Sequence, residues 1–137
     1  MIQYLLDTSV YSQRLRKQPV KGVVQRWSEI GNAKLAISII CEAEVLFGLE
    51  KKAAPRLWTE YEQYLKNQLV IIPLDRKIIA AYAQIKSETL AEGLIIGEFD
   101  LLIGATALAN KLTLATLNAK DFVKIPGLRV ESWSSIL

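Results

Sequence analysis

The chain contains no histidine and only one cysteine, Cys41, among its 137 residues. Without histidine, Ser-His-Asp and Cys-His triads, histidine-based ribonuclease chemistry and most zinc sites are excluded. A lone cysteine cannot form an intrachain disulfide, and Cys41 lies in an apolar helical stretch, where a small core residue is expected. Any catalysis must therefore use carboxylates, hydroxyls, lysines or a bound metal.

Long apolar runs are also missing from the sequence. No stretch approaches the roughly 18 apolar residues of a membrane span, and no basic segment precedes an apolar one at the amino terminus. We therefore expect a cytoplasmic protein that does not bind a membrane. Its length and its 51% of hydrophobic residues fit a single domain, residues 1–137, with a sizeable core.

The net charge of +3 is only mildly basic and does not by itself indicate a nucleic-acid partner. Its distribution is uneven, because residues 1–26 contain five basic side chains and one acidic side chain. Such a segment is either a solvated helix face or a phosphate-binding patch.

Apolar runs alternate with helical patterns along the whole chain. Strands are expected at 2–6, 34–38, 69–72, 112–116 and 128–131, and helices at 10–17, 21–30, 39–54, 56–67, 76–93 and 101–109. Strands separated by helices imply a parallel sheet covered on both faces. The predicted fold is therefore α/β, a three-layer α/β/α sandwich around a mainly parallel sheet of four to five strands.

Four acidic residues occupy unusual positions in this pattern. Asp7 and Asp121 follow strand ends, Glu44 projects from an apolar helix face, and Asp100 is the only charge between Phe99 and Ala109. Asp7, Asp100 and Asp121 each have an ordinary alternative role, as a helix cap, a turn residue or a complement to a helix dipole. Glu44 differs, because a lone carboxylate among apolar neighbours is costly unless it has a partner. Because a parallel sheet brings its strand ends to one edge, the four carboxylates can meet there.

Carboxylates that meet repel one another, so either their pKa values rise or cations neutralise them. Oxygen ligands without histidine or thiolate suit Mg²⁺ or Mn²⁺. The pattern therefore favours a divalent-metal site that hydrolyses phosphodiesters without histidine.

Four segments of the chain resemble the PIN-domain family, and within it the VapC-type toxin ribonucleases of type II toxin–antitoxin systems. The segments are LLDTSV at 5–10, residues 38–48 with AEVLFG at their end, FDLLIGATA at 99–107 and TLNAKDF at 116–122. The resemblance implies that an acidic quartet holds the metal, formed by Asp7, Glu44, Asp100 and Asp121. It also implies that small polar residues support these acids or contact the phosphate, namely Thr8, Ser9, Thr116 and Asn118.

The chain departs from the family pattern at two positions, with Ser9 where many relatives have asparagine and Gly104 where alanine is commoner. Neither change removes a metal ligand. Glu98 is an extra acid just before Asp100 and is either an outer-sphere partner or a solvated glutamate.

The resemblance further implies a Mg²⁺- or Mn²⁺-dependent endoribonuclease, a homodimer and a small VapB-like antitoxin partner. Arg14, Lys17 and Lys120 are candidates to position the RNA backbone, and the helices around Trp27 and Trp58 could contact the antitoxin or pack in the core.

Two alternatives remain. One is a catalytically silent PIN-like module that binds RNA or protein. The other is a different Mg²⁺-dependent phosphohydrolase, for which a haloacid-dehalogenase type would need a second aspartate where Ser9 stands.

Overall fold

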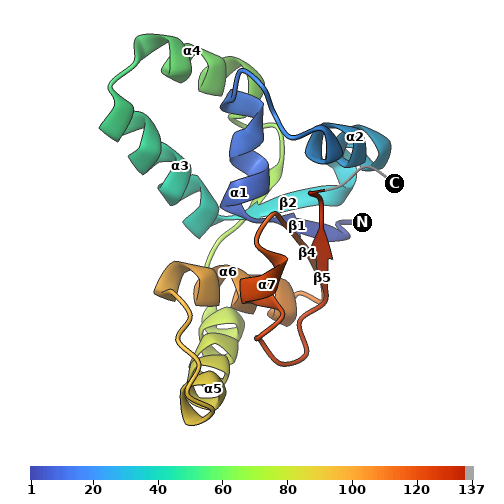
Figure 1. Ribbon diagram of the computed structural model, residues 1–137, viewed down its shortest axis with the longest axis vertical. Helices are drawn as coiled ribbons and strands as arrows, with labels where there is room; N and C mark the ends of the chain where they lie inside the picture. Colours follow the sequence, from blue (N-terminus) through green and yellow to red (C-terminus); the bar gives the residue numbers. More distant parts are fainter. Residues whose placement is uncertain (135–137) are drawn as a thin grey trace.

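Five parallel strands form a single sheet in the computed structural model, which describes residues 1–134 (Figure 1). The last three residues of the predicted domain, 135–137, lie outside the described residues. The strand order is β3-β2-β1-β4-β5, and each neighbouring pair is parallel. The strands are β1 (Tyr4–Leu6), β2 (Leu35–Ser38), β3 (Val70–Ile72), β4 (Thr113–Thr116) and β5 (Val130–Ser132). The predicted parallel sheet is confirmed, with β1 at its centre.

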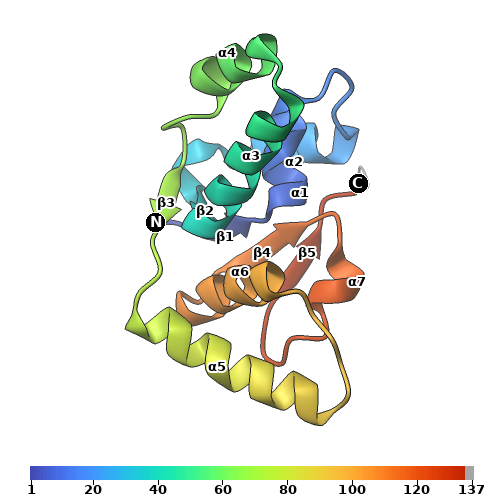
Figure 2. The same ribbon diagram turned by 90° about the vertical axis from the view of Figure 1, so that its left-hand side faces the viewer.

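Helices cover both faces of this sheet, as Figures 1 and 2 show. They are α1 (Thr8–Tyr11), α2 (Lys21–Ile30), α3 (Ile39–Lys52), α4 (Pro55–Tyr64), α5 (Arg76–Ala91), α6 (Glu98–Ala109) and α7 (Ala119–Phe122), with the 3₁₀ helices η1 (Ser12–Leu15) and η2 (Asn32–Lys34). The predicted three-layer α/β/α sandwich is confirmed. Within residues 1–134, none of these helices is long and apolar enough to cross a membrane.

Alternation along the central strands builds two cores, one on each face of the sheet. Leu6 and Ile37 pack against side chains from α1 to α4, whereas Leu5 and Ala36 pack against α5, α6 and α7. Successive side chains of a strand point to opposite faces, so the uniformly apolar strands supply both layers. Cys41 is fully buried in the first core, as predicted.

The first predicted helix, 10–17, differs from the observed one. The helix begins at Thr8, two residues earlier than predicted, with Asp7 as its N-cap. After Tyr11 the chain continues as the 3₁₀ helix η1. Buried Gln13 then accepts a hydrogen bond from the backbone N–H of Val20 (2.9 Å) and donates one to the carbonyl of Ser9 (3.2 Å). These hydrogen bonds of the Gln13 side chain, which periodicity cannot reveal, hold the loop that follows η1.

Other helix boundaries also differ from the predicted ones. The predicted helix 56–67 begins at Pro55, whose missing N–H suits a first turn, and ends at Tyr64. The predicted helix 101–109 begins three residues earlier, at Glu98. The long fifth helix was predicted correctly at its start, where the Asp75 carboxylate accepts the backbone N–H of Ile78 (2.8 Å).

Gly104 lies where α6 packs against the loop after α7. A Cβ atom at position 104 would be 2.6 Å from Cδ1 of Ile125, which is buried. The departure from alanine therefore has a packing cause.

This close approach predicts an energetic coupling between Gly104→Ala and Ile125→Val. The effect of Gly104→Ala on the free energy of unfolding should be more favourable by about 1 kcal/mol in the Ile125→Val protein than in the wild type, because valine lacks Cδ1. Denaturant unfolding of the four proteins in this cycle measures the coupling. A coupling energy near zero would contradict the contact.

Candidate active site

Asp7 lies directly after β1, where the sheet order changes direction. β1 pairs with β2 on one side and with β4 on the other, which is the position where ligands bind in open parallel sheets. Oδ1 of Asp7 accepts the backbone N–H of Val10 (3.2 Å), and the residue is 3% exposed. The helix-cap alternative is therefore correct for Asp7, and the same carboxylate also lies at the ligand-binding edge.

Two hydroxyl groups fix the Asp7 carboxylate from opposite sides. Ser9 Oγ donates to Oδ1 (2.5 Å), and Thr116 Oγ1 donates to Oδ2 (2.7 Å). The hydroxyls are held in turn, because Leu117 N–H donates to Ser9 Oγ (3.0 Å) and Asn118 N–H to Thr116 Oγ1 (2.8 Å). Burial raises the pKa of Asp7 above its ordinary value, and these hydrogen bonds oppose the rise.

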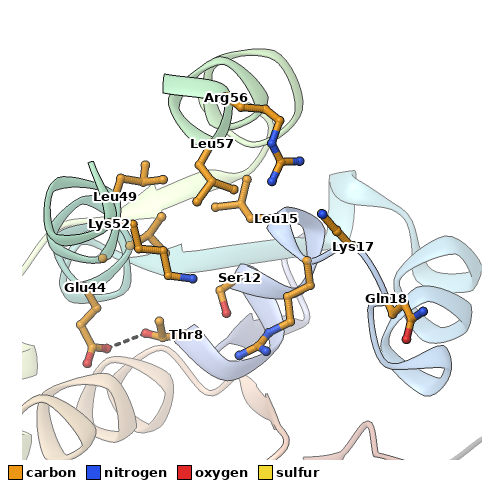
Figure 3. Close-up of a pocket in the computed structure, with 13 residues that line it drawn as sticks. Thr8, Ser12, Leu15, Lys17, Gln18, Glu44, Leu49, Lys52, Arg56 and Leu57 are labelled. Carbon is orange, nitrogen blue, oxygen red and sulfur yellow. Dashed lines mark hydrogen bonds between the residues drawn. The ribbon is translucent and has the colours of Figure 1, made fainter. Parts of the chain in front are cut away.

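Glu44 lies in the second turn of α3, which begins directly after β2. Ser38 starts this helix by accepting the backbone N–H of Ile40 at its Oγ (3.0 Å). Thr8 Oγ1 donates to Oε1 of Glu44 (2.5 Å), so the hydroxyl that follows Asp7 connects α1 to α3 (Figure 3). Thr8, Ser9 and Thr116 thus contact the predicted acids directly.

Asp100 lies in the first turn of α6 and is half-buried. Burial raises the pKa of Asp100, and the negative charges of Glu44, Asp7 and Asp121 raise it further. Within residues 1–134, no hydrogen bond opposes this rise. The ionised form of Asp100 is therefore disfavoured both by burial and by its acidic neighbours.

Asp121 is exposed on α7, with Lys124 Nζ 4.0 Å from its Oδ1. In the described part of the chain, no three acidic or thiol side chains are close enough to hold one ion. The structure thus brings Asp100 within range of the charges of Asp7, Glu44 and Asp121 without closing the described acids into a coordination shell. Their oxygen-only chemistry fits a hard divalent cation, since the buried thiol of Cys41 has a raised pKa and stays protonated.

Asn118 and Glu98 behave differently from the other predicted residues. Asn118 is exposed and enters the Asp7 network through its backbone N–H. Glu98 accepts hydrogen bonds from Lys86 Nζ (2.6 Å) and from the Tyr82 hydroxyl. Glu98 therefore joins α6 to α5, and its partners are not the other acids.

The predicted contact residues divide between core and surface. Trp27 is 3% exposed, donates from Nε1 to Asn32 (2.7 Å) and carries the Arg14 guanidinium 4.4 Å from its ring centroid. Of the two roles left open for Trp27, the structure supports core packing. Trp58 is partly buried against the same core, and Lys120 is exposed on α7.

A groove of about 620 Å³ opens beside Glu44, between the α1–η1 segment, α3 and α4 (Figure 3). We call it the Glu44 groove. Lys17, a predicted RNA contact, lines it together with three cations that the sequence reasoning missed: Arg16, Lys52 and Arg56. Spacing could have revealed Lys52, which follows Glu44 by two helical turns. Nothing in the sequence placed α4, and hence Arg56, beside this groove.

The raised pKa of Asp100 predicts that Asp100→Asn stabilises the metal-free protein. The melting temperature in EDTA should rise by a few degrees at pH 7, because the amide removes a half-buried charge and its repulsion from three acids. Glu98→Gln is the matched control in the same helical turn, and it should not raise the melting temperature, since it removes the ion pair with Lys86. Equal or lower stability of Asp100→Asn would contradict the charge cluster.

The same group predicts a pH dependence. A carboxyl whose folded pKa is raised contributes stability that is fully present below its ordinary pKa of 3.8 and is lost as pH rises through the folded value. The stability advantage of Asp100→Asn over the wild type should therefore shrink as pH is lowered from 7 toward 4. Melting curves at several pH values in EDTA measure it, and a constant difference would contradict the raised pKa.

Comparison with known proteins agrees with this architecture. The PIN domain model matches residues 4–128. The chain is 33% identical over 130 residues to ribonuclease VapC2 of Rickettsia felis, covering 95% of this chain and 97% of the relative.

Solved structures are similar over nearly the whole chain. DNA-bound VapBC of Salmonella typhimurium is 28% identical, with a TM-score of 0.88 over 97% of this chain and 99% of that one. A toxin–antitoxin complex of Klebsiella pneumoniae is 25% identical, with a TM-score of 0.75 over 98% of this chain and 100% of that one. Together with the family match over residues 4–128, these similarities show that the chain belongs to the PIN-domain family, in its VapC-type group.

Proposed function

We propose that this protein is a Mg²⁺- or Mn²⁺-dependent endoribonuclease and the toxin of a toxin–antitoxin pair. The observation that carries the proposal is the cluster of Asp7, Glu44 and Asp121 near Asp100, whose pKa is raised by burial and further by the charges of these three acids. A relative that is 33% identical is named a ribonuclease. Both observations support hydrolysis of RNA phosphodiesters at this edge of the sheet.

The metal would be held by Asp7, Glu44, Asp100 and Asp121. When bound, a divalent cation activates water and offsets negative charge on the phosphate. The carboxylates lose their mutual repulsion when a cation neutralises them, so binding is favoured by the same charges that destabilise the metal-free site.

The hydroxyls of this chain orient its acids. Ser9 and Thr116 fix both oxygens of Asp7, and Thr8 fixes one oxygen of Glu44. Because these three hydroxyls are committed to carboxylates, the exposed amide of Asn118 is the group that we assign to phosphate contact.

The proposal includes partners. The solved relative from Klebsiella pneumoniae is a toxin–antitoxin complex, which supports a small VapB-like antitoxin for this chain. Several large apolar side chains are exposed, including Phe47 (67%), Ile95 (87%) and Phe99 (50%), which supports burial against a partner or in a homodimer. A cytoplasmic location is also part of the proposal, because cellular RNA would be the substrate.

The two alternatives are less well supported. A silent binding module has no use for clustered carboxylates, which would repel phosphate, and the hydroxyl network holds two of them in fixed orientations. A haloacid-dehalogenase type lacks its second aspartate, because Ser9 occupies that position and donates to Asp7.

Loss of one ligand tests the activity. Asp100→Asn should lower the rate of Mg²⁺-dependent RNA cleavage by at least about 100-fold, since even outer-shell changes at metal sites cost 10- to 100-fold. The protein should remain folded, as judged by circular dichroism, and EDTA should abolish cleavage by the wild type. Gel analysis of labelled RNA fragments gives the rates.

Glu98→Gln again serves as the control, because it removes an acid two residues away that pairs with Lys86. It should retain cleavage within a few-fold of the wild type. Cleavage that survives Asp100→Asn or EDTA would overturn the proposal and indicate another chemistry or a contaminating nuclease.

A further inference from the structure

We propose that the Glu44 groove carries a single RNA strand into the active site, with its phosphates bound by Arg16, Lys17, Lys52 and Arg56. This inference rests on the proposed ribonuclease function. It adds a path for the RNA and four residues that position its phosphates, all of them outside the acidic quartet.

The charge of the groove is the first support. Among the described residues that line it, four are cations and only one, Glu44, is an acid. Arg16, Lys17 and Lys52 form no ion pair within residues 1–134. Arg56 pairs with Glu60 (3.1 Å) in an exposed pair of one helix, which exchanges readily for another anion. Unpaired cations gathered around one hollow attract a polyanion.

The path from these cations to the acids is open. Glu44, Gly48 and Lys52 follow one another at intervals of four residues on one face of α3. Gly48 lines the groove, and a Cβ atom there would meet nothing within 4 Å. Figure 3 shows Lys52 and Arg56 reaching into the groove from α3 and α4, with Glu44 and its bond to Thr8 at one end.

The lining also suits a single strand rather than a duplex. Between the cations, the groove is lined by apolar side chains that include Leu49 and Leu57. Such a surface accepts the sugar and the face of an unstacked base, which only single-stranded segments present. A strand also supplies one phosphate per nucleotide for the four cations, whereas a peptide would need a run of acidic residues to match them.

A binding experiment on a non-cleaving background tests the path. In Asp100→Asn protein with Mg²⁺, fluorescence anisotropy follows a fluorescein-labelled single-stranded RNA of mixed sequence over a range of salt concentrations. Removing one phosphate contact should reduce the slope of log affinity against log salt by about 0.7, or about fivefold in affinity at 0.1 M salt. Lys52→Ala should show this loss, and Arg16→Ala combined with it should double the change in slope.

Lys51→Ala is the matched control, because Lys51 is the exposed neighbour of Lys52 on α3 and does not line the groove. It should leave the slope unchanged. Equal affinities and slopes for Lys51→Ala and Lys52→Ala would overturn the proposal and leave the groove to a protein partner.

Gly48 gives a test that does not alter charge. Gly48→Leu places a side chain in the groove without altering its charge, so it should weaken RNA binding at least about fivefold while the protein stays folded, whereas Gly48→Ala should bind as Gly48 does. Equal binding by the two variants would overturn the path. Loss of cleavage in Asp100→Asn would still stand in that case, so failure of this inference is distinct from failure of the ribonuclease proposal.

Discussion

The pair of hydrogen bonds that Ser9 and Thr116 donate to Asp7 joins the parts of the molecule on which the site depends. Thr116 ends β4 and Asp7 follows β1, so their bond fixes the two strands at the edge where the sheet changes direction. Ser9 continues the same network into α1 and accepts the backbone N–H of Leu117 from the opposite segment. A buried carboxylate with this many donors can stay at a sheet edge, because its desolvation is offset by hydrogen bonds. The rest of the site is arranged around a charge whose position is already set.

The acids around Asp7 show how the site differs from a structural ion-pair network. Glu44 is bonded to a neutral hydroxyl and not to a cation, and Asp100 feels three like charges. In the part of the chain that the structure describes, the cations of the Glu44 groove form no ion pair with these carboxylates. Apart from Asp121, which lies 4.0 Å from Lys124, the acids are therefore adjacent to the cations but not paired with them in residues 1–134, as expected where an external cation and an external polyanion both bind.

Much of the fold could be predicted because its strands are short, apolar and separated by helical patterns. The parallel sheet, the cap at Asp75 and the buried Cys41 followed from local patterns. The helix ends were predicted less accurately, since individual side-chain contacts decide them: the side chain of buried Gln13 bonds to the backbone of Val20, which no periodicity encodes. For Asp7, the roles of helix cap and site residue do not exclude each other. One carboxylate has two oxygens, so it can cap a helix and also lie at the edge of the sheet where ligands bind.

The charged residues show where sequence reasoning ends. Glu98 and Asp100 occupy the same helical turn, yet Glu98 pairs with Lys86 while Asp100 faces the other acids. Successive residues of a helix are rotated by about 100°, so Glu98 and Asp100 point in different directions. Only the position of α5 shows that Glu98 is the acid that pairs with Lys86. In the same way, the basic amino-terminal segment split into Arg14, which stacks on a core tryptophan, and Lys17, which lines a groove.

The two glycines within α3 and α6 illustrate the difference between a packing constraint and a functional one. Glycine inside a helix costs roughly 0.5–1 kcal/mol relative to alanine, so each needs a reason. At Gly104 the reason is internal, because a methyl group would meet buried Ile125. At Gly48 a methyl group would meet nothing in the described part of the chain, and the helix would gain stability from alanine. The packing of this chain therefore does not require glycine at position 48, and a ligand that passes between Lys52 and Glu44 would be obstructed there by a large side chain but not by a methyl group.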